Sequence, residues 1–368
     1  MKTIAMFAAY YYPHLGGIER YIHNLMGQFV KKGYRVILIT SNYNDDLEYE
    51  EKDGLVIYRL PVFNIFKNRY PIFKYNKKYH EIMKKLDNYD IDRIIVNTRF
   101  HLTSHIGARY GKKHSIPVYL IDHSSDYISV NSKFWDFFAN RYENFLTKRL
   151  KKYVTGFYGV SQACCDWLKR LNVEPSGVWY NSIDSNKKMP KRVKHKGINF
   201  LYAGRILEEK GVGNILISFN NLLNDYDNIN LYIAGSGEKL EEYKNQFKHK
   251  SINFLGQLDF ETLLKYYAKT DVFLYPSMYP EGLPTSILEA GLMGCAVIGT
   301  LRGGSKEVLN SENSIIVEEN QESLEAAMKK MIDDEKFRVM SAKNMHEFVI
   351  SNFSWEATAE KVLKDMEI

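Results

Sequence analysis

The chain has 368 residues and a formal net charge of +6, and 45% of its residues are hydrophobic while 26% are charged. This is the composition of a folded globular protein, and the length is sufficient for two domains that each bury a sizeable core. Since no apolar run approaches the roughly 18 residues that a membrane-spanning helix requires, we expect a soluble protein rather than an integral membrane protein.

The basic surplus lies in the first half of the chain. Residues 1–185 carry 27 basic and 18 acidic side chains, whereas the remaining residues carry 23 and 26. This asymmetry favours an anionic partner, which could be a membrane surface, a phosphorylated substrate or a nucleic acid. The charge pattern does not choose among the three.

Short β-branched and aromatic runs alternate with helical patterns along the first half. The runs are KTIAMFAA, YRVILIT, DRIIVNT, IPVYLID and VTGFYGV, and a helix is expected from Ile18 to Lys32. The alternation predicts βαβ units around a parallel sheet. The opening MKTIAMFAAYYY has the charge and apolar run of a signal peptide, but it also fits a buried first strand that leads into a glycine loop, and we favour the strand.

A second series of strands begins after residue 197. Its members are INFLYAG, INLYIAG, INFLGQ, DVFLYPS, CAVIGT and NSIIVEE. The lysine-rich segment Asp184–Gly197 between the two series lacks an apolar period and is the linker candidate. We therefore expect an α/β protein with two doubly wound parallel-sheet domains, residues 1–183 and 184–353, that enclose a cleft, and a C-terminal helix at about 354–368 that packs back on the first domain.

The three cysteines, two of them adjacent at Cys164 and Cys165, cannot form a paired disulfide framework. They favour a reducing compartment, so we expect a cytoplasmic protein. No CxxC or clustered Cys/His spacing accompanies them, which argues against a metal site at these residues.

A pair of glycines follows the first strand. The segment YYPHLGGIER places Gly16 and Gly17 directly before the expected helix, where they could let a phosphate approach the backbone or simply form a tight turn. The spacing is not GxGxxG, and no acidic residue ends the strand YRVILIT. The dinucleotide fingerprint of an oxidoreductase is therefore absent.

Two cations follow the first strand of the second series. In FLYAGRILEEKGV, Arg205 comes directly after the strand and Lys210 lies five residues later. The planar fork of arginine and the compact charge of lysine suit the oxygens of a diphosphate whose charge grows as it departs. The alternative is that both are surface charges that flank a loop.

Two acids frame a helix start in YPEGLPTSILEA. Glu281 precedes the helix, Pro284 suits its first turn, and Glu289 lies about 7 Å further along the axis at the usual helical rise. The exposed amides of the first turn attract an anion, and a carboxylate can hold the two hydroxyls of a ribose. Alternatively, either acid alone merely stabilises the helix N-terminus. Together with the two cations, the pattern predicts a nucleotide-sugar site.

These residues resemble those of the retaining, GT-B-fold glycosyltransferases of family 4 (group 1), whose EX7E motif matches Glu281 to Glu289. The resemblance covers most of the chain through PHLGGIER, IDH ending at His123, GVSQ, NSID, AGRILEEKG, IAGSGE, EGLPTSILEA and GGSKEVL. It implies two Rossmann-like domains facing across a cleft. The chain departs at Asn181-Ser182, where the family commonly has NG, which puts only that turn in doubt.

The resemblance also implies residue roles. It implies a catalytic set of His123, Glu281, Arg205 and Lys210 and a donor-binding set of Gly16, Gly17, Arg205, Lys210, Gly282, Leu283, Pro284 and Glu289. His123 would contact the transferred sugar, Arg205 and Lys210 would bind the diphosphate, Glu281 would orient the sugar, and Glu289 would hold the ribose. Glu307 and the Gly303-Gly304 turn would shape the same pocket. A histidine at His123 that serves only the core is the alternative.

The implied reaction transfers a sugar from a UDP- or GDP-sugar to an acceptor hydroxyl with retention, in the synthesis of a polysaccharide, glycan or glycolipid. We expect no cofactor and no metal. The DxD spelling Asp90-Ile91-Asp92 comes before the strand RIIVNT rather than after one, so we interpret it as a strand start on the surface.

Two basic and aromatic stretches of the first half are candidates for acceptor or membrane contact. Val62–His80 could meet the acceptor or be a solvated loop and helix. The stretch KFWDFFANRYENFLTKRLKKY has apolar residues at helical spacing, namely Trp135, Phe138, Tyr142, Phe145, Leu146 and Leu150. It could be a helix that faces the core, or it could support peripheral association with the inner face of an anionic membrane, where a lipid-linked glycan would be the acceptor.

Two rival functions stay open. A sugar-nucleotide 2-epimerase of similar two-lobed architecture would bind the same donor without an acceptor. A basic nucleic-acid-binding protein is conceivable on charge alone, but no recognised motif supports it, and we expect no nucleic-acid partner.

Overall fold

A computed structural model describes the chain except for residues 15, 44–46, 53, 64–69, 128–132 and 185–188. The chain divides into two compact units, one made of residues 1–181 together with 355–368 and the other of residues 182–354. The first unit therefore includes the C-terminal helix. Parts of the predicted linker, of the Val62–His80 stretch and of the PHLGGIER segment lie outside the described residues.

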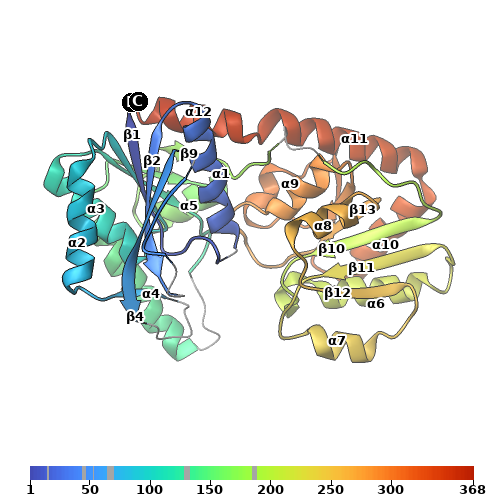
Figure 1. Ribbon diagram of the computed structural model, residues 1–368. Helices are drawn as coiled ribbons and strands as arrows, with labels where there is room; N and C mark the ends of the chain where they lie inside the picture. The colour runs from blue at the N-terminus through green and yellow to red at the C-terminus, as the bar shows by residue number, and fades with distance from the viewer. Residues whose placement is uncertain (15, 44–46, 53, 64–69, 128–132, 185–188) are drawn as a thin grey trace. The chain divides into compact units, whose positions relative to one another are not determined.

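The first unit contains a mostly parallel sheet and helices on its two faces (Figure 1). The strands are β1 (Thr3–Phe7), β2 (Arg35–Asn42), β3 (Tyr49–Lys52), β4 (Leu55–Phe63), β5 (Ile72–Phe73), β6 (Arg93–Asn97), β7 (Val118–Asp122), β8 (Gly156–Gly159) and β9 (Gly177–Val178). The helices are α1 (Gly17–Lys31), α2 (Lys77–Lys85), α3 (Leu102–His114), α4 (Lys133–Leu150), α5 (Gln162–Arg170) and α12 (Trp355–Asp365), with a 3-10 turn η2 at Leu86–Asn88.

The strand order of this sheet is β3-β4-β2-β1-β6-β7-β8-β9, and β5 pairs with β4. The strands β3 and β5 run antiparallel to β4, whereas β1, β2, β4 and β6 to β9 pair in parallel. The chain leaves β1 toward β2 on one side and later adds β6 on the other side. The carboxyl ends of β1 and β6 therefore form the switch point at which open α/β sheets bind ligands.

Strand β1 shows how the sequence builds this core. All five of its residues are buried, and they alternate between the two faces of the sheet. Ala5 and Phe7 join the cluster that includes α2 and α3, whereas Ile4 and Met6 join the cluster that includes α1 and α12. Because helices cover both faces, the strand is apolar at every position from Ile4 to Phe7 rather than alternating.

Helix α12 completes the first unit although it comes last in the sequence. It lies beside α1, as Figure 1 shows, and Trp355 packs edge-on against Tyr21 with ring centroids 5.1 Å apart. The indole of Trp179 donates to Asp365 Oδ2 over 2.9 Å, and Arg93 Nε donates to the carbonyl of Met366 over 2.7 Å. The sheet face that α1 covers is thus shared with α12.

The second unit is a parallel sheet with the strand order β12-β11-β10-β13-β14-β15. Its strands are β10 (Ile198–Ala203), β11 (Ile229–Ala234), β12 (Ile252–Gly256), β13 (Val272–Tyr275), β14 (Ala296–Gly299) and β15 (Ser314–Ile316). Its helices are α6 (Val212–Leu222), α7 (Leu240–Gln246), α8 (Phe260–Tyr267), α9 (Thr285–Leu292), α10 (Gln321–Asp333) and α11 (Glu335–Asn352), with 3-10 turns η3 at Glu208–Lys210 and η4 at Gly303–Glu307.

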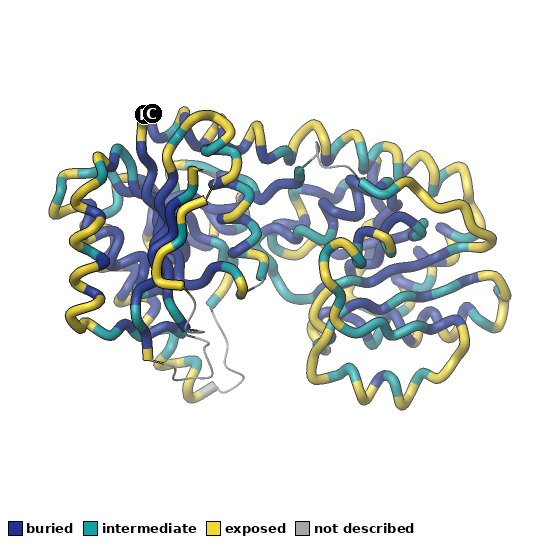
Figure 2. The backbone as a smooth tube through the Cα atoms, viewed as in Figure 1, coloured by how far each residue is buried: buried dark blue, intermediate teal, exposed yellow. Residues whose placement is uncertain are grey.

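One face of this second sheet packs against α6 and α10. Phe200 and Leu231 of the sheet meet Ile215 of α6 and Met328 of α10 in one buried cluster. Figure 2 shows the central strand β10 mostly in the colour of buried residues and α7 largely in that of exposed ones. Truncation of a core ring such as that of Phe200 would cost about 3–5 kcal/mol.

The strand series of both halves and the α/β fold class are confirmed. The structure adds β3, β4, β5 and β9, which the sequence patterns did not predict, and α1 begins at Gly17 rather than Ile18. Pro284 is the residue before α9 rather than part of its first turn. Among the described residues, no helix is long and apolar enough to cross a membrane.

For the stretch at 133–153, the core-facing alternative is wrong for most of its aromatic residues. Trp135 is 62% exposed and Phe145 is 53% exposed, and Phe138 and Tyr142 are exposed as well. Of the apolar residues in the predicted set, Leu146 and Leu150 are buried.

Candidate active site

The switch point of the second unit lies between β10 and β13, because the chain adds β11 and β12 on one side of β10 and β13 to β15 on the other. The loop after β10 carries Arg205 and Lys210, and the loop after β13 carries Glu281 and leads into α9 with Glu289. The sequence-predicted residues of this unit therefore follow the two strands at which a parallel sheet binds its ligand.

The loop after β10 is held against the loop after β13. Gly211 follows Lys210 with φ of +71°, and a Cβ atom there would lie 2.3 Å from the carbonyl oxygen of Pro276. A glycine is required at this position for both reasons. The phenol of Tyr202 donates to the carbonyl of Arg205 over 2.7 Å, which fixes the start of the loop.

Lys210 and Glu281 form an ion pair at this junction. Lys210 is only 4% exposed, and its Nζ bonds Glu281 Oε1. The other carboxylate oxygen accepts a hydrogen bond of 2.9 Å from the phenol of Tyr275. Burial, and next the charge of Glu281, raise the pKa of Tyr275 well above its usual range, so the phenol stays a donor. Each oxygen of Glu281 is thus held by a separate partner.

A close backbone contact positions the Glu281 segment. The amide of Gly304 donates to the carbonyl of Glu281 over 2.9 Å. A Cβ atom on Gly304 would lie 1.8 Å from the carbonyl oxygen of Gly282, and one on Gly303 would lie 2.1 Å from that of Glu281. The Gly303-Gly304 turn, which starts the 3-10 segment that ends at Glu307, therefore packs directly on the segment before α9.

The segment before α9 leaves backbone donors open. Within the described residues, the amides of Gly282 and Leu283 donate no hydrogen bond. They precede Pro284 and the first turn of α9, whose own amides point away from the helix body. These donors and the positive end of the helix dipole favour an anion or an electronegative hydroxyl oxygen at this place.

Glu289 lies in α9 and is 7% exposed. The phenol of Tyr267, which is fully buried, shares its single hydrogen between Glu289 Oε2 at 3.3 Å and the carbonyl of Ser286 at 3.2 Å. Because a charged carboxylate is costly to bury unless it is hydrogen-bonded, Tyr267 both stabilises Glu289 and orients it.

Arg205 differs from the other predicted residues of this unit. Its side chain is exposed, and in the described part of the chain it forms no ion pair. The structure therefore joins Lys210 and Glu281 in an ion pair. Arg205, on the same loop as Lys210, and Glu289, on the helix that follows Glu281, do not bond either member of this pair.

In the first unit, Gly16 and Gly17 come after β1 and start α1. A Cβ atom on Gly17 would meet nothing within 4 Å, whereas one on Gly16 would lie 2.4 Å from Glu19 Oε2. Glu19 is buried and pairs with His14 over 3.3 Å, and this hydrogen bond raises the pKa of His14. An anion at Gly16 would meet the Glu19 carboxylate, whereas Gly17 is exposed.

His123 follows β7 and is held by two neighbours. Its Nε2 lies 3.3 Å from Asn97 Oδ1, and its ring packs edge-on against Tyr21 at 5.0 Å between centroids. Because the Asn97 amide nitrogen donates to the carbonyl of Phe7, Oδ1 is the acceptor and Nε2 carries the hydrogen. Burial, and next the nearby His101, lower the pKa of His123 to about 3. The imidazole is therefore neutral at pH 7, with Nδ1 as an acceptor.

Comparison with protein families shows the family to which the chain belongs. Residues 15–187 match the family described as Glycosyltransferase Family 4, and residues 184–363 match the family described as Glycosyl transferases group 1. Both halves of the chain are thus assigned. The chain belongs to the family 4, group 1 glycosyltransferases.

Relatives and solved structures agree with this assignment. The glycosyltransferase is 26% identical to an uncharacterized glycosyltransferase of Methanocaldococcus jannaschii, over 99% of this chain and 98% of that one. It is 25% identical to a phosphatidylinositol N-acetylglucosaminyltransferase component of Homo sapiens, over 98% of this chain and 75% of that one. The structure of HepE of Anabaena in complex with UDP-glucose has a TM-score of 0.76 at 15% identity over all of both chains, which supports the two-domain, Rossmann-like GT-B fold.

The glycosyltransferase contains a buried charge network that sequence reasoning missed. Arg99 is fully buried and bonds Asp122 and Glu143, each over 2.7 Å. Burial, which outweighs the opposing effect of Arg99, raises the pKa of Asp122. Asp122 directly precedes His123, so the network fixes the end of β7 from which His123 extends. Tyr267, Tyr275 and Asn97 were also missed.

The acids Asp90 and Asp92 lie at a strand start. Asp92 directly precedes β6, and its carboxylate accepts a hydrogen bond of 2.7 Å from the amide of Thr3. This is the position predicted from the sequence. Across the residues that the structure describes, no group of three or more His, Cys, Asp or Glu side chains could hold a metal ion.

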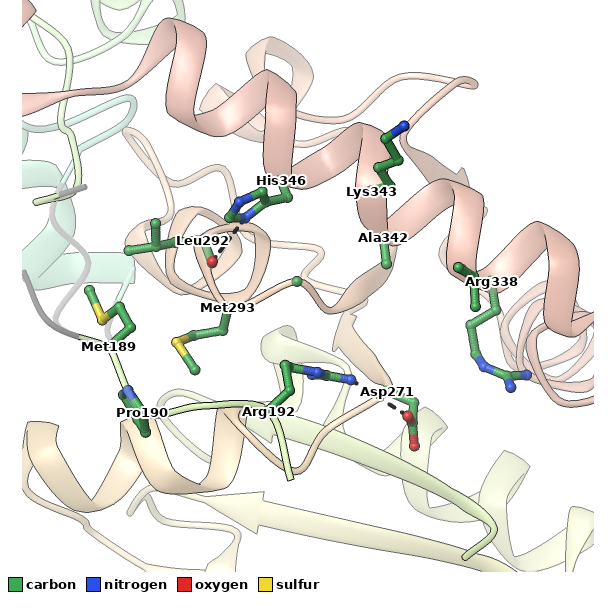
Figure 3. A pocket seen from close by; sticks show the side chains of 12 residues that line it. Met189, Pro190, Arg192, Asp271, Leu292, Met293, Arg338, Ala342, Lys343 and His346 are labelled. Carbon is green, nitrogen blue, oxygen red and sulfur yellow. Dashed lines mark hydrogen bonds and ion pairs between the residues drawn. The ribbon is translucent and has the colours of Figure 1, made fainter. Parts of the chain in front are cut away.

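Two cavities lie apart from the predicted residues. One, of about 480 Å³ in the second unit, is lined by residues that include Arg192, Asp271, Met293 and His346 (Figure 3). Two of its polar groups have partners within the lining, since Arg192 pairs with Asp271 and His346 contacts the carbonyl of Leu292. The other, of about 800 Å³ in the first unit, lies between the β1–α1 loop, α1 and β4. None of the predicted site residues lines either cavity.

Proposed function

We propose that this glycosyltransferase moves a sugar from a nucleotide-diphosphate sugar to an acceptor hydroxyl with retention of the anomeric configuration and without a metal. The observation that carries the proposal is the arrangement at the switch point of the second unit. There, the Lys210–Glu281 pair lies beside the open amides of Gly282 and Leu283, and the Gly303-Gly304 turn holds that segment in place.

The departing diphosphate is the group that most needs stabilisation, because its charge grows as the bond to the sugar breaks. Arg205 has no ion pair among the described residues, so its guanidinium is available for phosphate oxygens. Lys210 is buried and already aligned by Glu281, and it adds a second cation on the same loop. The amides before α9 supply further donors without any rearrangement.

The two acids have separate tasks in this proposal. Glu281, held by Lys210 and Tyr275, orients the hydroxyls of the donor sugar. Glu289, held by Tyr267 inside α9, accepts hydrogen bonds from the ribose. Because each acid is fixed by its own phenol, the distance between sugar and ribose contacts is set by the protein rather than by the ligand.

In the first unit, the proposal assigns the donor sugar to His123 and the donor diphosphate to the amide of Gly17. A neutral His123 with Nδ1 as acceptor suits a sugar hydroxyl better than a phosphate. The open space at Gly17 allows a ligand to approach its amide closely. These assignments follow the family resemblance and are tested by His123→Ala.

The proposed reaction takes place on one face of the sugar. The acceptor oxygen forms a bond to the anomeric carbon as the bond from that carbon to the diphosphate breaks. The departing phosphate oxygen takes the proton of the acceptor hydroxyl, and the bonding electrons leave with the diphosphate. No enzyme nucleophile is needed, so the protein acts by binding, orientation and charge stabilisation.

We propose a UDP- or GDP-sugar as donor and a glycan or lipid-linked glycan as acceptor. The HepE structure holds UDP-glucose on a similar fold, and the human relative is named for the transfer of N-acetylglucosamine to phosphatidylinositol. The three cysteines are buried thiols, which supports a cytoplasmic location.

A thermal-shift screen against UDP, GDP and ADP and their sugars tests the donor site. We expect one nucleotide class to raise the melting temperature, and Lys210→Met and Glu289→Gln to remove most of that shift. Lys239→Met and Glu325→Gln are matched controls, because both side chains form exposed contacts elsewhere in the second unit. Shifts of equal size in all four variants would refute the site.

Product analysis tests the reaction itself. Incubation with donor and acceptor extracts should release the nucleoside diphosphate and join the sugar to the acceptor with the donor's anomeric configuration, in the presence or absence of a chelator. An epimerised donor sugar without release of nucleoside diphosphate would instead establish the epimerase alternative.

A further inference from the structure

Helix α4 displays large aromatic side chains to solvent. Phe134 is 64% exposed, Trp135 is 62%, Phe137 is 56%, Phe138 is 50% and Phe145 is 53%. Isolated apolar residues on a surface need no explanation, but the rings of Phe134, Trp135, Phe137 and Phe138 contact one another, and large apolar patches mark interaction sites. Tyr142, at 43% exposed, extends the same surface. We call these six residues the α4 aromatic face.

The helix itself is firmly anchored, so the exposure is not that of a loose segment. At 100° per residue, the α4 aromatic face covers about 160° of the helix circumference. The opposite side carries Glu143, Leu146 and Leu150, all buried. Glu143 bonds the fully buried Arg99 over 2.7 Å, which fixes the rotation of α4 about its axis. Since this side of α4 faces the core, the aromatic side chains on the other side face solvent.

Cations accompany the aromatic face. Arg141, Lys148 and Arg149 are exposed and fall within the same arc of the helix. Arg141 lies over the ring of Phe137 at 5.5 Å and Arg149 over that of Phe145 at 5.6 Å. In the described part of the chain, none of these three cations forms an ion pair. Lys151 and Lys152, which directly follow the helix, are exposed as well.

We propose that the α4 aromatic face docks on the surface of an anionic lipid bilayer. Phenylalanine and tryptophan rings partition into the interface between headgroups and acyl chains, and arginine and lysine beside them pair with anionic headgroups. Lys148 and Arg149 lie in the last turn of α4, whereas four of the six rings lie in its N-terminal half, namely those of Phe134, Trp135, Phe137 and Phe138. The helix therefore lies on the bilayer, with its first turns deepest and its basic end among the headgroups.

The charge pattern argues against a second copy of the chain as the occupant. A symmetric dimer through this face would collect the Arg141, Lys148 and Arg149 cations of both copies in one interface, where the α4 aromatic face itself offers no acid to pair with them, and this is unfavourable. A bilayer with anionic lipids covers the rings and neutralises the cations together. The proposal is independent of the nucleotide-sugar chemistry, since α4 carries none of the assigned donor-binding residues.

Trp135 provides a built-in reporter for the test. The other three tryptophans, Trp167, Trp179 and Trp355, are all buried, so a change of emission on docking comes from Trp135. The full-length protein is mixed with vesicles of phosphatidylcholine alone or with 30 mol% phosphatidylglycerol added. We expect a blue shift of the emission and quenching by brominated acyl chains with the anionic vesicles, and flotation with them in a density gradient.

Two variants separate the aromatic and the charge contributions. The variant Phe134→Ser/Phe138→Ser should bind the anionic vesicles at least about tenfold more weakly. The variant Arg141→Gln/Lys148→Gln/Arg149→Gln should lose roughly fivefold per cation at low salt and should respond little to added salt. The matched control Val339→Ser/Met340→Ser removes apolar residues that are equally exposed on α11 and should bind like the wild type.

The readouts also separate this proposal from the proposed function. The α4 variants should retain the wild-type melting temperature and the wild-type shift with nucleotide. The proposal is overturned if wild-type protein ignores anionic vesicles, if it binds zwitterionic vesicles equally well, or if the α4 variants bind like the α11 control. A concentration-dependent dimer that the α4 variants abolish, without vesicle binding, would assign the face to a second copy and overturn it too.

Discussion

The substitution Gly304→Ala isolates the close contact that positions Glu281. The new Cβ atom would lie 1.8 Å from the carbonyl oxygen of Gly282, and it would be flanked by Leu283 Cα at 3.0 Å. Real Cβ atoms do not come closer than 3.0 Å to such an atom, so the two backbone segments must separate by more than 1 Å. Both neighbours are backbone, so rotation of a side chain cannot relieve the contact.

A displacement of this size acts on the donor site more than on the fold. Overpacking costs about 1–3 kcal/mol of stability, which a chain of this size tolerates. A misplacement of about 1 Å in a group that binds the reacting sugar can cost about 100-fold in rate. Because Gly304 also bonds the carbonyl of Glu281, the shift carries the Glu281 backbone with it. We expect a folded protein that transfers sugar about 100-fold more slowly.

The matched control is Gly294→Ala in the same unit. Gly294 has φ of +70°, but a Cβ atom there would meet nothing within 4 Å. This substitution costs about 1–2 kcal/mol through the left-handed backbone alone and leaves the Glu281 segment in place. Urea unfolding and nucleoside diphosphate release are measured for both variants. If Gly304→Ala transfers sugar as fast as Gly294→Ala, the proposed role of the contact is wrong.

Four further outcomes test separate contacts. Tyr275→Phe removes one hydrogen bond from Glu281 and should lower kcat with little change in nucleotide affinity, whereas Tyr267→Phe removes one hydrogen bond from Glu289 and should weaken nucleotide binding, as titration calorimetry would show. Arg99→Met leaves two carboxylates buried without their cation and should cost about 3–5 kcal/mol in urea unfolding. Burial lowers the pKa of His101 to about 3, whereas histidine in the unfolded chain titrates near pH 6.5. Between about pH 3 and pH 6.5 the unfolded chain therefore binds more protons than the folded protein. Stability should therefore be complete above about pH 6.5 and fall toward pH 3, by roughly 2 kcal/mol at pH 5 from His101, and His101→Gln should flatten this loss.

The sequence predicted the parallel strands because both faces of each sheet are covered by helices. A strand such as β1 or β13 is then buried throughout and almost entirely apolar, and such runs are easy to recognise. The strand β4 was not predicted although it is long and mostly buried. It contains Arg59 and Pro61, and Arg59 can be buried because Glu50 and the carbonyls of Tyr12 and Leu47 accept its hydrogen bonds. These partners come from β3, from the residues just before it and from the loop after β1, which no local pattern reveals.

The sequence predicted only part of the candidate site, again because local patterns do not show which side chains the fold brings together. Spacing was enough to select Lys210, Glu281 and Glu289, because the loops after parallel strands meet at one sheet edge. The phenols of Tyr267 and Tyr275 come from other elements and have no recognisable spacing to the acids that they hold. Arg99 is likewise joined to Glu143 only through the fold. That bond fixes the rotation of α4 so that its aromatic residues face solvent. The periodicity alone placed most of these residues on one side of the helix but did not show whether that side faces the core or solvent.

The return of α12 to the first unit determines the order in which the two units become complete during synthesis. Residues 182–354 form one uninterrupted stretch, so the second unit has all of its parts when Ser354 leaves the ribosome. The first unit begins earlier but lacks Trp355 and the rest of α12 until translation has passed through the second. Until then, the apolar surface around Tyr21 and Trp179 is uncovered on the nascent chain, and a chaperone that protects this surface would assist folding.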